Sequence, residues 1–208
     1  MGSGIFITFE GIDGSGKSSQ ARLLAEQLKA DGKQLVLTRE PGGSEGAEEI
    51  RRLLVEGAPD RWSAETEILL FTAARRDHLE KTIEPALRAG KIVVSDRFAD
   101  STRVYQGVAR ADLRGVVDAL HEQMIGREPD LTFIIDMEPK TALARGLARG
   151  SGEDRFEELG LEFQIALRRG FLALATDFPA RCHLINGARD MDEIAAEIRQ
   201  ITSDALTT

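Results

Sequence analysis

The sequence has little cysteine, no excess of positive charge and no long apolar run. Cys182 is the single cysteine among 208 residues, which excludes an internal disulfide and a cysteine-based metal cluster. Such usage is typical of a buried thiol in a cytoplasmic protein. A membrane-spanning helix requires about 20 consecutive apolar residues, and no stretch of the sequence comes close to that length. We therefore expect a cytoplasmic protein without a membrane partner.

The balance of charge argues against two further classes of partner. Acidic residues outnumber basic residues by 35 to 27, which gives a formal net charge of −8. Such a surface disfavours broad binding to nucleic acid or to anionic membranes. Residues 1–4 lead directly into an apolar segment, so we expect no signal peptide. Phe6 stands where an N-myristoylation signal has serine or threonine.

Short apolar segments alternate with amphipathic segments along the whole chain. Apolar runs predict strands at residues 5–9, 35–37, 92–95, 131–136 and 183–186. Helical patterns lie between them, at residues 18–31, 44–55, 63–90, 100–107, 112–126, 140–149, 161–177 and from 190 onward. This alternation predicts an α/β fold, a five-stranded parallel sheet with helices on both faces. Because no repeat, low-complexity tract or linker interrupts it, we expect residues 1–208 to form one domain.

A glycine-rich segment carries a specific chemical signature. Gly11–Ser18 fits the pattern G-x-x-x-x-G-K-[ST] and lies between an apolar strand and the start of a helix. Glycines let consecutive backbone N–H groups turn toward an anion, and the helix N-terminus adds positive potential. Lys17 is expected to neutralise terminal phosphates, and the Ser18 hydroxyl to bind Mg²⁺. The predicted triphosphate site comprises Gly11, Ile12, Asp13, Gly14, Ser15, Gly16, Lys17, Ser18 and Ser19.

Polar residues follow the other predicted strands. They are Arg39-Glu40, Asp96-Arg97, Asp136 and Asn186. In parallel α/β sheets, ligands lie beyond the carboxyl ends of the strands. Two arginines beside a triphosphate loop are more than one nucleotide requires, so a second anionic substrate is expected, with Arg39 and Arg97 binding its phosphate. The alternative is that these side chains are loop caps and surface ion pairs.

Four short segments are distinctive in their composition and order. They read Gly-Ile-Asp-Gly-Ser-Gly-Lys-Ser at 11–18, Thr-Arg-Glu-Pro-Gly-Gly at 38–43, Ser-Asp-Arg-Phe at 95–98 and Ser-Thr-Arg-Val-Tyr-Gln-Gly at 101–107. Together they resemble the thymidylate kinase family, and the resemblance covers nearly the whole chain. The second and fourth segments make the match specific, because the phosphate loop alone is generic. The resemblance implies a P-loop nucleoside-monophosphate-kinase-like fold with a lid, and the transfer of a phosphoryl group from Mg²⁺-ATP to dTMP.

The resemblance also implies which residues bind dTMP. Arg39 and Arg97 would hold its phosphate. Phe71 would stack on thymine, and Arg75, on the same helix face, would hydrogen-bond the edge of the base. The alternative for Phe71 is core packing, which would leave Arg75 as a solvated neighbour.

Four further residues are implied at the base and the sugar. Thr102 and Gln106 would contact the base and its surroundings. Tyr105 would crowd the sugar 2′ position and favour deoxyribose, unless it is only a half-buried helix residue. Asp13 would face the sugar 3′-hydroxyl or the hydration shell of Mg²⁺, unless it is an ordinary solvent-facing loop residue.

For catalysis, the resemblance is to the bacterial type, in which a lid supplies arginine. The phosphate loop itself holds no arginine, and the lid would span about residues 146–157. Its arginines would close onto the ATP phosphates, while Arg145 could instead lie over adenine. A solvated, basic helix end is the alternative. The implied catalytic residues are Lys17, Asp13, Arg97, Arg149 and Arg155, with Ser18 and Asp96 at the Mg²⁺ ion.

The sequence leaves two rival functions open. One is a kinase for another nucleoside monophosphate or a deoxynucleoside, and the other is a nucleotide-binding module without transfer chemistry. The Asn-Lys-x-Asp guanine motif of GTPase switches is absent from the sequence. An ionised acceptor phosphate needs no strong general base, and none of the three histidines is an obvious candidate. Since the family is usually homodimeric, a homodimer is implied.

Overall fold

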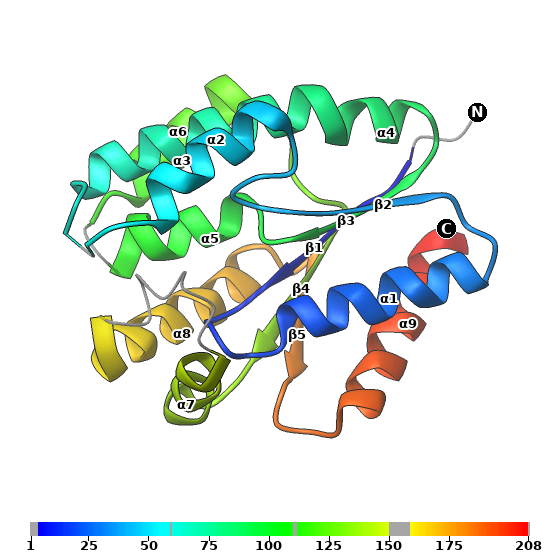
Figure 1. The fold of residues 1–208 in the computed structure, drawn as a ribbon. Helices are drawn as coiled ribbons and strands as arrows, with labels where there is room; N and C mark the ends of the chain where they lie inside the picture. Colours follow the sequence, from blue (N-terminus) through cyan, green and yellow to red (C-terminus); the bar gives the residue numbers. More distant parts are fainter. Residues whose placement is uncertain (1–3, 59, 110–111, 150–158, 208) are drawn as a thin grey trace.

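The computed structural model describes residues 4–58, 60–109, 112–149 and 159–207. Strands and helices alternate along these residues (Figure 1). Three short turns of π-helix, η1–η3, continue α-helices. In chain order the elements are β1 (Phe6–Glu10), α1 (Lys17–Ala30), β2 (Leu35–Arg39), α2 (Glu45–Val55), α3 (Ala64–His78), η1 (Leu79–Ile83), α4 (Glu84–Arg88), β3 (Ile92–Asp96), α5 (Ala99–Val104), η2 (Tyr105–Ala109), α6 (Arg114–Leu120), η3 (His121–Ile125), β4 (Leu131–Asp136), α7 (Pro139–Arg149), α8 (Gly160–Asp177), β5 (Cys182–Asn186) and α9 (Met191–Thr207).

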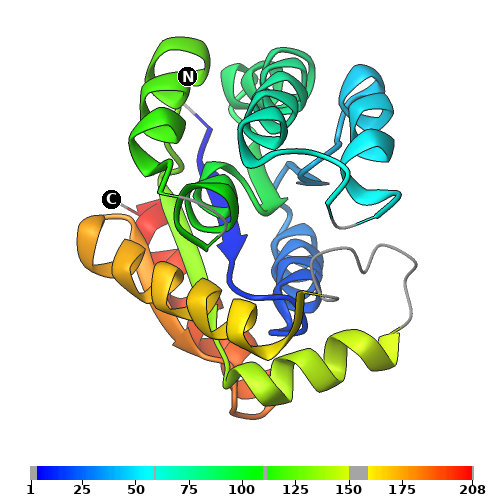
Figure 2. The same ribbon diagram turned by 90° about the vertical axis from the view of Figure 1, so that its left-hand side faces the viewer.

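Within the described residues the five strands form one sheet, in the order β2-β3-β1-β4-β5. Every neighbouring pair is parallel, so the predicted five-stranded parallel sheet is confirmed. Because β1 pairs with both β3 and β4, the segment after β1 leaves the centre of the sheet at its carboxyl edge. Figure 2 looks onto this edge. It is the position at which α/β proteins bind nucleotides.

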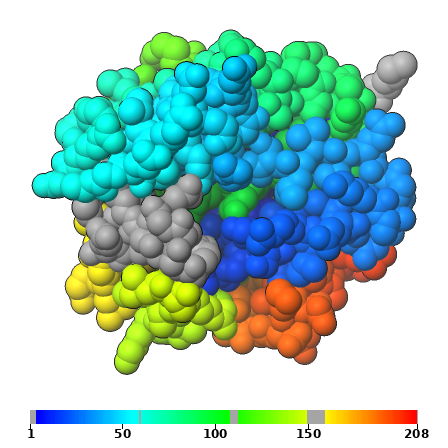
Figure 3. All heavy atoms as spheres, viewed as in Figure 1, coloured from blue at the N-terminus to red at the C-terminus, as the bar shows by residue number. Residues whose placement is uncertain are grey.

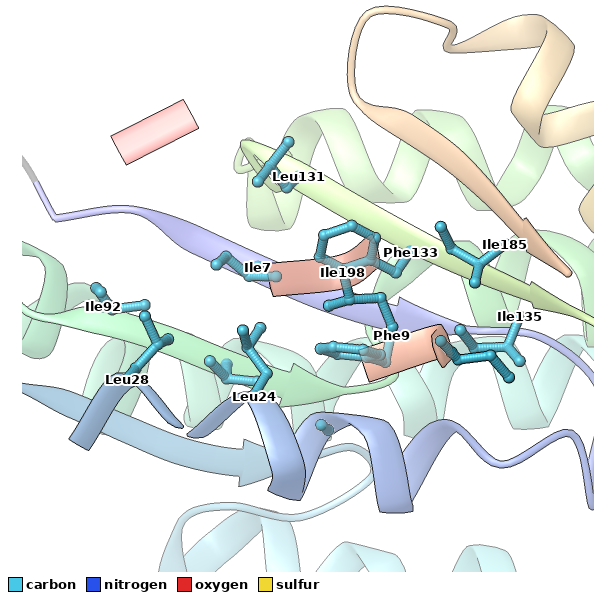
Figure 4. Close-up of a cluster of buried hydrophobic side chains, with 13 residues drawn as sticks. Ile7, Phe9, Leu24, Leu28, Ile92, Leu131, Phe133, Ile135, Ile185 and Ile198 are labelled. Carbon is cyan, nitrogen blue, oxygen red and sulfur yellow. The ribbon is translucent and has the colours of Figure 1, made fainter. Parts of the chain in front are cut away.

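One face of the sheet is covered by α1 and α9 (Figure 1). Alternate side chains of a strand point to opposite faces, and Ile7 and Phe9 of β1 point to this one. They pack with Leu24 and Leu28, four residues apart on α1, and with Ile198 of α9 (Figure 4). The apolar spacing of α1 therefore fixes the helix that follows the phosphate loop against the centre of the sheet.

The opposite face carries Phe6 of β1 and is covered by η1, α4, α5 and α8. Phe98, at the start of α5, meets Phe6 edge-on with ring centroids 4.9 Å apart. Further along the sheet, Ile134 of β4 packs with Leu167 and Phe171 of α8. These contacts hold the N-terminal end of α5 beside the carboxyl ends of β1 and β3.

The helix predicted for residues 63–90 is continuous but not uniform. Ser63 caps it, with Oγ accepting a hydrogen bond of 3.2 Å from the N–H of Thr66. α3 then passes through η1 into α4, and the N–H of Glu84 bonds to the carbonyl of Leu79. The change of pitch comes directly before Pro85, which has no N–H to offer the preceding turn.

The ends of other elements differ slightly from the sequence patterns. β2 continues to Arg39, beyond the apolar run that predicted it. Asp190 caps α9 by accepting a 2.9 Å hydrogen bond from the N–H of Asp192. Over the described residues we find no helix with the length and apolar character needed to traverse a bilayer.

Candidate active site

A cavity of about 290 Å³ lies where the strands end, between the phosphate loop, the ends of β2 and β3, and helices α2, α3 and α5. In Figure 3 the surface is hollowed between the segment that carries α2 and α3 and the dark-blue segment that carries the phosphate loop and α1. The sequence-predicted residues that line this cavity are Asp13, Lys17, Ser18, Arg39, Phe71, Arg75, Asp96, Arg97, Thr102, Tyr105 and Gln106. The cavity thus brings the predicted acceptor residues together with three residues of the phosphate loop. The other predicted donor residues do not line it; they are Gly11, Ile12, Gly14, Ser15, Gly16, Ser19 and Arg145.

Two glycines of the phosphate loop between β1 and α1 are required both by their backbone conformation and by their close packing. Gly11 and Gly14 have φ values of +135° and +78°, which side-chain-bearing residues rarely adopt. A Cβ on Gly14 would lie 2.0 Å from the carbonyl oxygen of Ala142 in α7, and one on Gly11 would lie 2.6 Å from that of Ile135. The loop therefore packs directly against α7 and β4, with its N–H groups near the start of α1.

Lys17 begins α1 and folds back over the loop. Its Nζ donates a 2.7 Å hydrogen bond to the carbonyl of Ile12 and lies 3.9 Å from the Asp13 carboxylate. Burial and the charge of Arg97 lower the pKa of Lys17 to about 8, and Asp13 offsets this only partly. A buried ammonium with a depressed pKa is stabilised by an added anion, so this position suits a phosphate. Ser18 and Ser19 follow in the first turn of α1.

Arg97, directly after β3, has a left-handed backbone with φ of 73°. Its Nη1 donates to Ser101 Oγ over 2.8 Å, and its Nη2 contacts the Asp13 carboxylate and donates to Tyr105 Oη over 3.2 Å. Burial alone would lower the pKa of Arg97, but Tyr105 and Asp13 outweigh it and hold that pKa above its ordinary value. The guanidinium is therefore a permanent cation at the cavity wall.

Tyr105 completes this cluster from the first turn of η2. Its hydroxyl donates to Asp13 Oδ2 over 2.6 Å, and the guanidinium of Arg97 lies 5.1 Å from its ring centroid. Burial, together with the charge of Asp13, raises the pKa of Tyr105 well above its ordinary value. The phenol consequently stays protonated and donates. Asp13 is thus oriented by an arginine and a tyrosine that lie far from it in sequence.

Helix α3 contributes a buried cation to the same cavity. Arg75 Nε donates to Glu40 Oε2 over 2.8 Å, and Nη2 donates to Thr102 Oγ1 and the carbonyl of Phe98 over 3.0 and 3.1 Å. The other oxygen of Glu40 accepts from Nδ1 of His78 over 3.0 Å. These contacts leave Arg75 little freedom, so the face it presents to the cavity is fixed.

Gln106 and Phe71 complete the wall. Gln106 Nε2 donates to Glu67 Oε2 over 3.0 Å, and both side chains are buried. This bond uses one of the two amide hydrogens of Gln106 and identifies its nitrogen as the atom facing Glu67, which leaves the amide oxygen able to accept a hydrogen bond from a ligand. Phe71 is half-buried, lines the cavity and belongs to none of the described core clusters. Its ring is therefore placed to contact a ligand.

Asp96 and Ser18 supply oxygen atoms of the kind that Mg²⁺ prefers. Asp96 Oδ1 is buried and has no hydrogen-bond partner among the described residues. Such an orphaned carboxylate oxygen is costly unless something else satisfies it. Since Asp96 and Ser18 line the same cavity, the residues present fit a hard cation there.

Two arginines lie nearer the solvent. Arg39 has a side chain 53% exposed and donates to Glu48 Oε2 over 3.1 Å. Arg51 of α2 donates to the carbonyl of Pro41 over 2.5 Å. An exposed ion pair of this kind contributes little free energy, so a phosphate can displace Glu48 from Arg39.

The predicted lid arginines are only partly within the described residues. Arg145 of α7 is exposed, and its Nη1 lies 3.3 Å from the sulfur of Met137. It does not line the cavity. The side chain of Arg149 and the whole of Arg155 lie outside the described residues, as do residues 150–157 of the predicted lid.

Sequence reasoning gave no role to six further residues that line the cavity. They are Glu40, Pro41, Arg51, Val55, Phe98 and Ser101. Four of them lie inside the motifs quoted for the family resemblance, so a signal was present. For Arg51 and Val55 the only signal is their spacing of four residues along α2.

Two of the polar strand-end residues have local partners instead of reaching the cavity. Asp136, at the end of β4, accepts two bonds from Arg168, of 2.6 and 2.8 Å. Asn186 Oδ1, at the end of β5, accepts a 3.0 Å bond from the N–H of Ala188. The polar residues that follow β1, β2 and β3 therefore converge on the cavity, whereas those at the ends of β4 and β5 do not.

A parallel sheet with a central phosphate loop, and an adjoining cavity that carries arginines for a second phosphate, define a P-loop kinase of the nucleoside-monophosphate class. The profile of the thymidylate kinase family matches residues 9–198. The thymidylate kinase of Ruegeria pomeroyi is 66% identical over 200 residues, covering 96% of this chain and 95% of the relative. That of Dinoroseobacter shibae is 69% identical over 195 residues, covering 94% of each. The crystal structure of thymidylate kinase from Ehrlichia chaffeensis superposes with a TM-score of 0.78 at 37% identity, covering 97% of this chain and 99% of that one. This chain belongs to the thymidylate kinase family.

Proposed function

We propose that this chain transfers the γ-phosphoryl group of ATP to dTMP, giving ADP and dTDP. One observation carries the proposal. A single cavity joins Asp13 and Lys17 of the phosphate loop to the buried Arg75 and Gln106, which present a fixed cation and a fixed amide. A donor nucleotide and a pyrimidine acceptor could therefore meet without either leaving the cavity.

The acceptor base is recognised by the buried wall of the cavity. Arg75 donates to an exocyclic oxygen of thymine, and the amide oxygen of Gln106 accepts the N3–H. Thr102, which also lines the cavity, accepts a 3.0 Å hydrogen bond from Arg75 and so helps to hold it in place. Phe71 stacks on the ring, which its half-buried position at the cavity supports.

The acceptor phosphate and sugar lie toward the cations. Arg97 binds the phosphate with Arg39 at the rim, because both are arginines whose planar groups match phosphate oxygens. Tyr105 packs against the 2′ position and excludes ribose. Asp13, held by Tyr105 at 2.6 Å, faces the 3′-hydroxyl.

The transfer itself requires positioning and positive charge rather than a base, since the acceptor oxygen is already ionised. The phosphate loop and Ser19 hold the donor, and Lys17 stabilises charge on its terminal phosphates. Asp96 and Ser18 would hold Mg²⁺, which when bound neutralises developing charge on the phosphate oxygens. Arg97 contacts the acceptor phosphate and thereby brings it in line with the donor.

We assign the remaining cationic help to the lid, about residues 146–157 of a single domain, 1–208. Gly14 of the phosphate loop packs against Ala142 of α7, so the helix that leads into the lid already touches the donor site. Arg149 and Arg155 would act on the ATP phosphates once the lid closes, and Arg145 would lie over adenine. Closure also excludes water.

We further propose a homodimer that works in the cytoplasm, where both nucleotides are found. Helices α2, α3 and α6 expose apolar side chains, among them Leu53, Leu69 and Val116 at 39%, 59% and 47%. Such side chains are suited to a subunit interface. Light scattering of the purified chain distinguishes a dimer from a monomer.

The activity is tested by measuring ADP release with dTMP, dUMP, dCMP, dGMP, AMP and deoxynucleosides as acceptors. We expect dTMP to have the highest kcat/KM. A better rate on another acceptor would favour the rival kinase. Nucleotide binding without ADP release in the presence of dTMP would favour a non-catalytic module.

A further inference from the structure

One fully buried carboxylate behind the cavity has no role in the proposed phosphoryl transfer. Glu10, the last residue of β1, does not line the cavity. Its Oε1 accepts from the N–H groups of Phe98 and Ser101 over 2.8 and 3.3 Å, and its Oε2 accepts from the Ser101 hydroxyl over 2.6 Å. Burial, with the charge of Asp100, raises the pKa of Glu10 to about 7. A neutral side chain of this shape would cost less to bury, so packing alone does not account for a carboxylate here.

The count of hydrogens fixes the direction of the bonds around Ser101. The guanidinium of Arg97 only donates, so the single hydrogen of the Ser101 hydroxyl cannot point to Arg97, and it points to Glu10 whenever that side chain is ionised. The oxygen of Ser101 is then free to accept, and Arg97 Nη1 donates to it over 2.8 Å. A relay therefore runs from Arg97 through Ser101 to Glu10. The carboxylate polarises the hydroxyl and so strengthens its bond to the guanidinium.

The same carboxylate also holds the backbone beside Arg97. Arg97 has its φ at 73°, a conformation that a non-glycine residue keeps only when its surroundings impose it. Its own N–H bonds to the carbonyl of Phe9 over 2.9 Å, and its carbonyl accepts from Ser95 Oγ over 2.8 Å. The next N–H, that of Phe98, goes to Glu10. Glu10 thus fixes both the main chain after Arg97 and one edge of its guanidinium.

The two edges of the guanidinium have different surroundings. Nη2 contacts Asp13 and Tyr105, which line the cavity and would face a substrate. Nη1 donates to Ser101, which also lines the cavity but is anchored to the buried Glu10, and to the carbonyl of Gly11 over 3.4 Å. An incoming phosphate can therefore exchange with the partners of Nη2 while the Nη1 edge stays in place.

We propose that Glu10 is a positioning residue for Arg97, holding the guanidinium through Phe98 and Ser101 at the angle that binds the phosphate of a nucleoside monophosphate. The inference rests on the proposed function, in which Arg97 binds the acceptor phosphate. Replacing a residue that has only a structural role would lower activity by the same factor whether or not Arg97 is present. Replacing a residue that positions Arg97 would lower activity only in a chain that retains Arg97.

The test is a double-mutant cycle with Glu10→Gln and Arg97→Lys, measured as kcat/KM for dTMP at saturating ATP. Because residues in one hydrogen-bond network are energetically coupled, Glu10→Gln should lower kcat/KM about tenfold in the wild-type background. Glu10→Gln should lower kcat/KM less than about twofold when Arg97 is already lysine, since the coupling between the two side chains has then been lost. The KM for ATP should stay unchanged.

Asp130→Asn is the matched control. Asp130 accepts a 2.7 Å bond from the N–H of Phe6, at the opposite end of the same strand, far from Arg97 in the register of the sheet. Asp130→Asn should lower kcat/KM for dTMP less than about twofold, both in the wild type and in Arg97→Lys. Circular dichroism and thermal melts establish that each variant is folded. If Glu10→Gln does not fold, Ser101→Ala, which removes only the hydroxyl of the relay, takes its place in the cycle.

The outcomes separate the two claims. Losses that are equal in the wild-type and Arg97→Lys backgrounds would overturn the positioning role while leaving the proposed function intact. A wild-type chain that phosphorylates no nucleoside monophosphate would overturn the proposed function and the positioning role together. A loss confined to the background that retains Arg97 supports the positioning role.

Discussion

The guanidinium of Arg75 donates from Nε to Oε2 of Glu40 over 2.8 Å, and both side chains are only 4% exposed. Removing the charge of one partner of a buried ion pair leaves the other uncompensated, at a cost of about 3 kcal/mol. We expect Glu40→Gln to lower the free energy of unfolding by about that amount. We also expect a higher KM for dTMP, because Arg75 is released from the orientation that the base requires. Urea denaturation and steady-state kinetics measure the two effects.

Glu80→Gln provides the comparison, on the helical segment of α3 and η1 that also carries Arg75. Glu80 pairs with Arg76, and both side chains are about half exposed, at 51% and 49%. An exposed pair of this kind contributes roughly 0–1 kcal/mol, so neither stability nor the KM for dTMP should change much. Equal effects of the two substitutions would contradict a special role for the buried pair.

Phe71 tests whether the base stacks at the cavity wall. Stacking of a base on an aromatic ring contributes about 1–3 kcal/mol, so Phe71→Ala should raise the KM for dTMP roughly 5- to 150-fold. Stability should change little, because Phe71 is half-buried and outside the described core clusters. Phe133→Ala, at a fully buried position, should instead cost about 3–5 kcal/mol of stability. An unchanged dTMP affinity in folded Phe71→Ala would assign Phe71 to packing.

Most of the fold could be predicted from local patterns. Buried parallel strands are short apolar runs, and each of the five runs became a strand. The spacing of Leu24 and Leu28 fixed the buried face of α1 in the same way. Pro85 is the only sequence signal for the π-helical turn η1, because a change of helical pitch depends on how neighbouring helices pack. Boundaries also moved where polar residues such as Arg39 continued a strand through pairing with β3.

The site could be predicted where a residue's type states its chemistry. Lys17 and Arg97 are cations beside a phosphate loop, and the cavity brings them together. The residues that orient them could not be predicted, because their partners are distant in sequence. Glu10 and Ser101 are 91 positions apart. Only the pairing of β1 with β3 brings that carboxylate to the start of α5.

The lid arginine is tested through the split between turnover and binding. Arg149 ends α7, whose Ala142 carbonyl packs against Gly14 of the phosphate loop. If Arg149 contacts the transferring phosphate only when the lid is closed, Arg149→Ala should lower kcat by about 100-fold and leave the affinity for dTMP nearly unchanged. Lys140→Ala, at an exposed position in the first turn of α7, should leave both unchanged. A loss of dTMP affinity at constant kcat would contradict the assignment.

Lys17 should impose an upper pH limit on ATP capture. Burial and the neighbouring Arg97 lower its pKa to about 8 in the free chain, so the ammonium is lost above that pH. The profile of kcat/KM for ATP reports groups of the free enzyme and should therefore fall above about pH 8. The profile of kcat should stay flat to a higher pH, because a bound triphosphate raises the pKa of Lys17. A kcat/KM profile that is flat to pH 10 would contradict this role of the ammonium.

Glu10 should make stability fall as the pH rises through neutrality. Burial and the charge of Asp100 raise its pKa from 4.5 to about 7 in the folded chain. Between these values the folded state binds more protons than the unfolded state, so raising the pH favours unfolding. Glu10→Gln has no proton to lose. The unfolding free energy of the wild type minus that of Glu10→Gln should therefore fall by roughly 3 kcal/mol between pH 4.5 and pH 7, and level off above about pH 8. Urea denaturation of both chains at intervals of one pH unit measures the difference. A constant difference across this range would mean that the carboxyl keeps its ordinary pKa despite its burial.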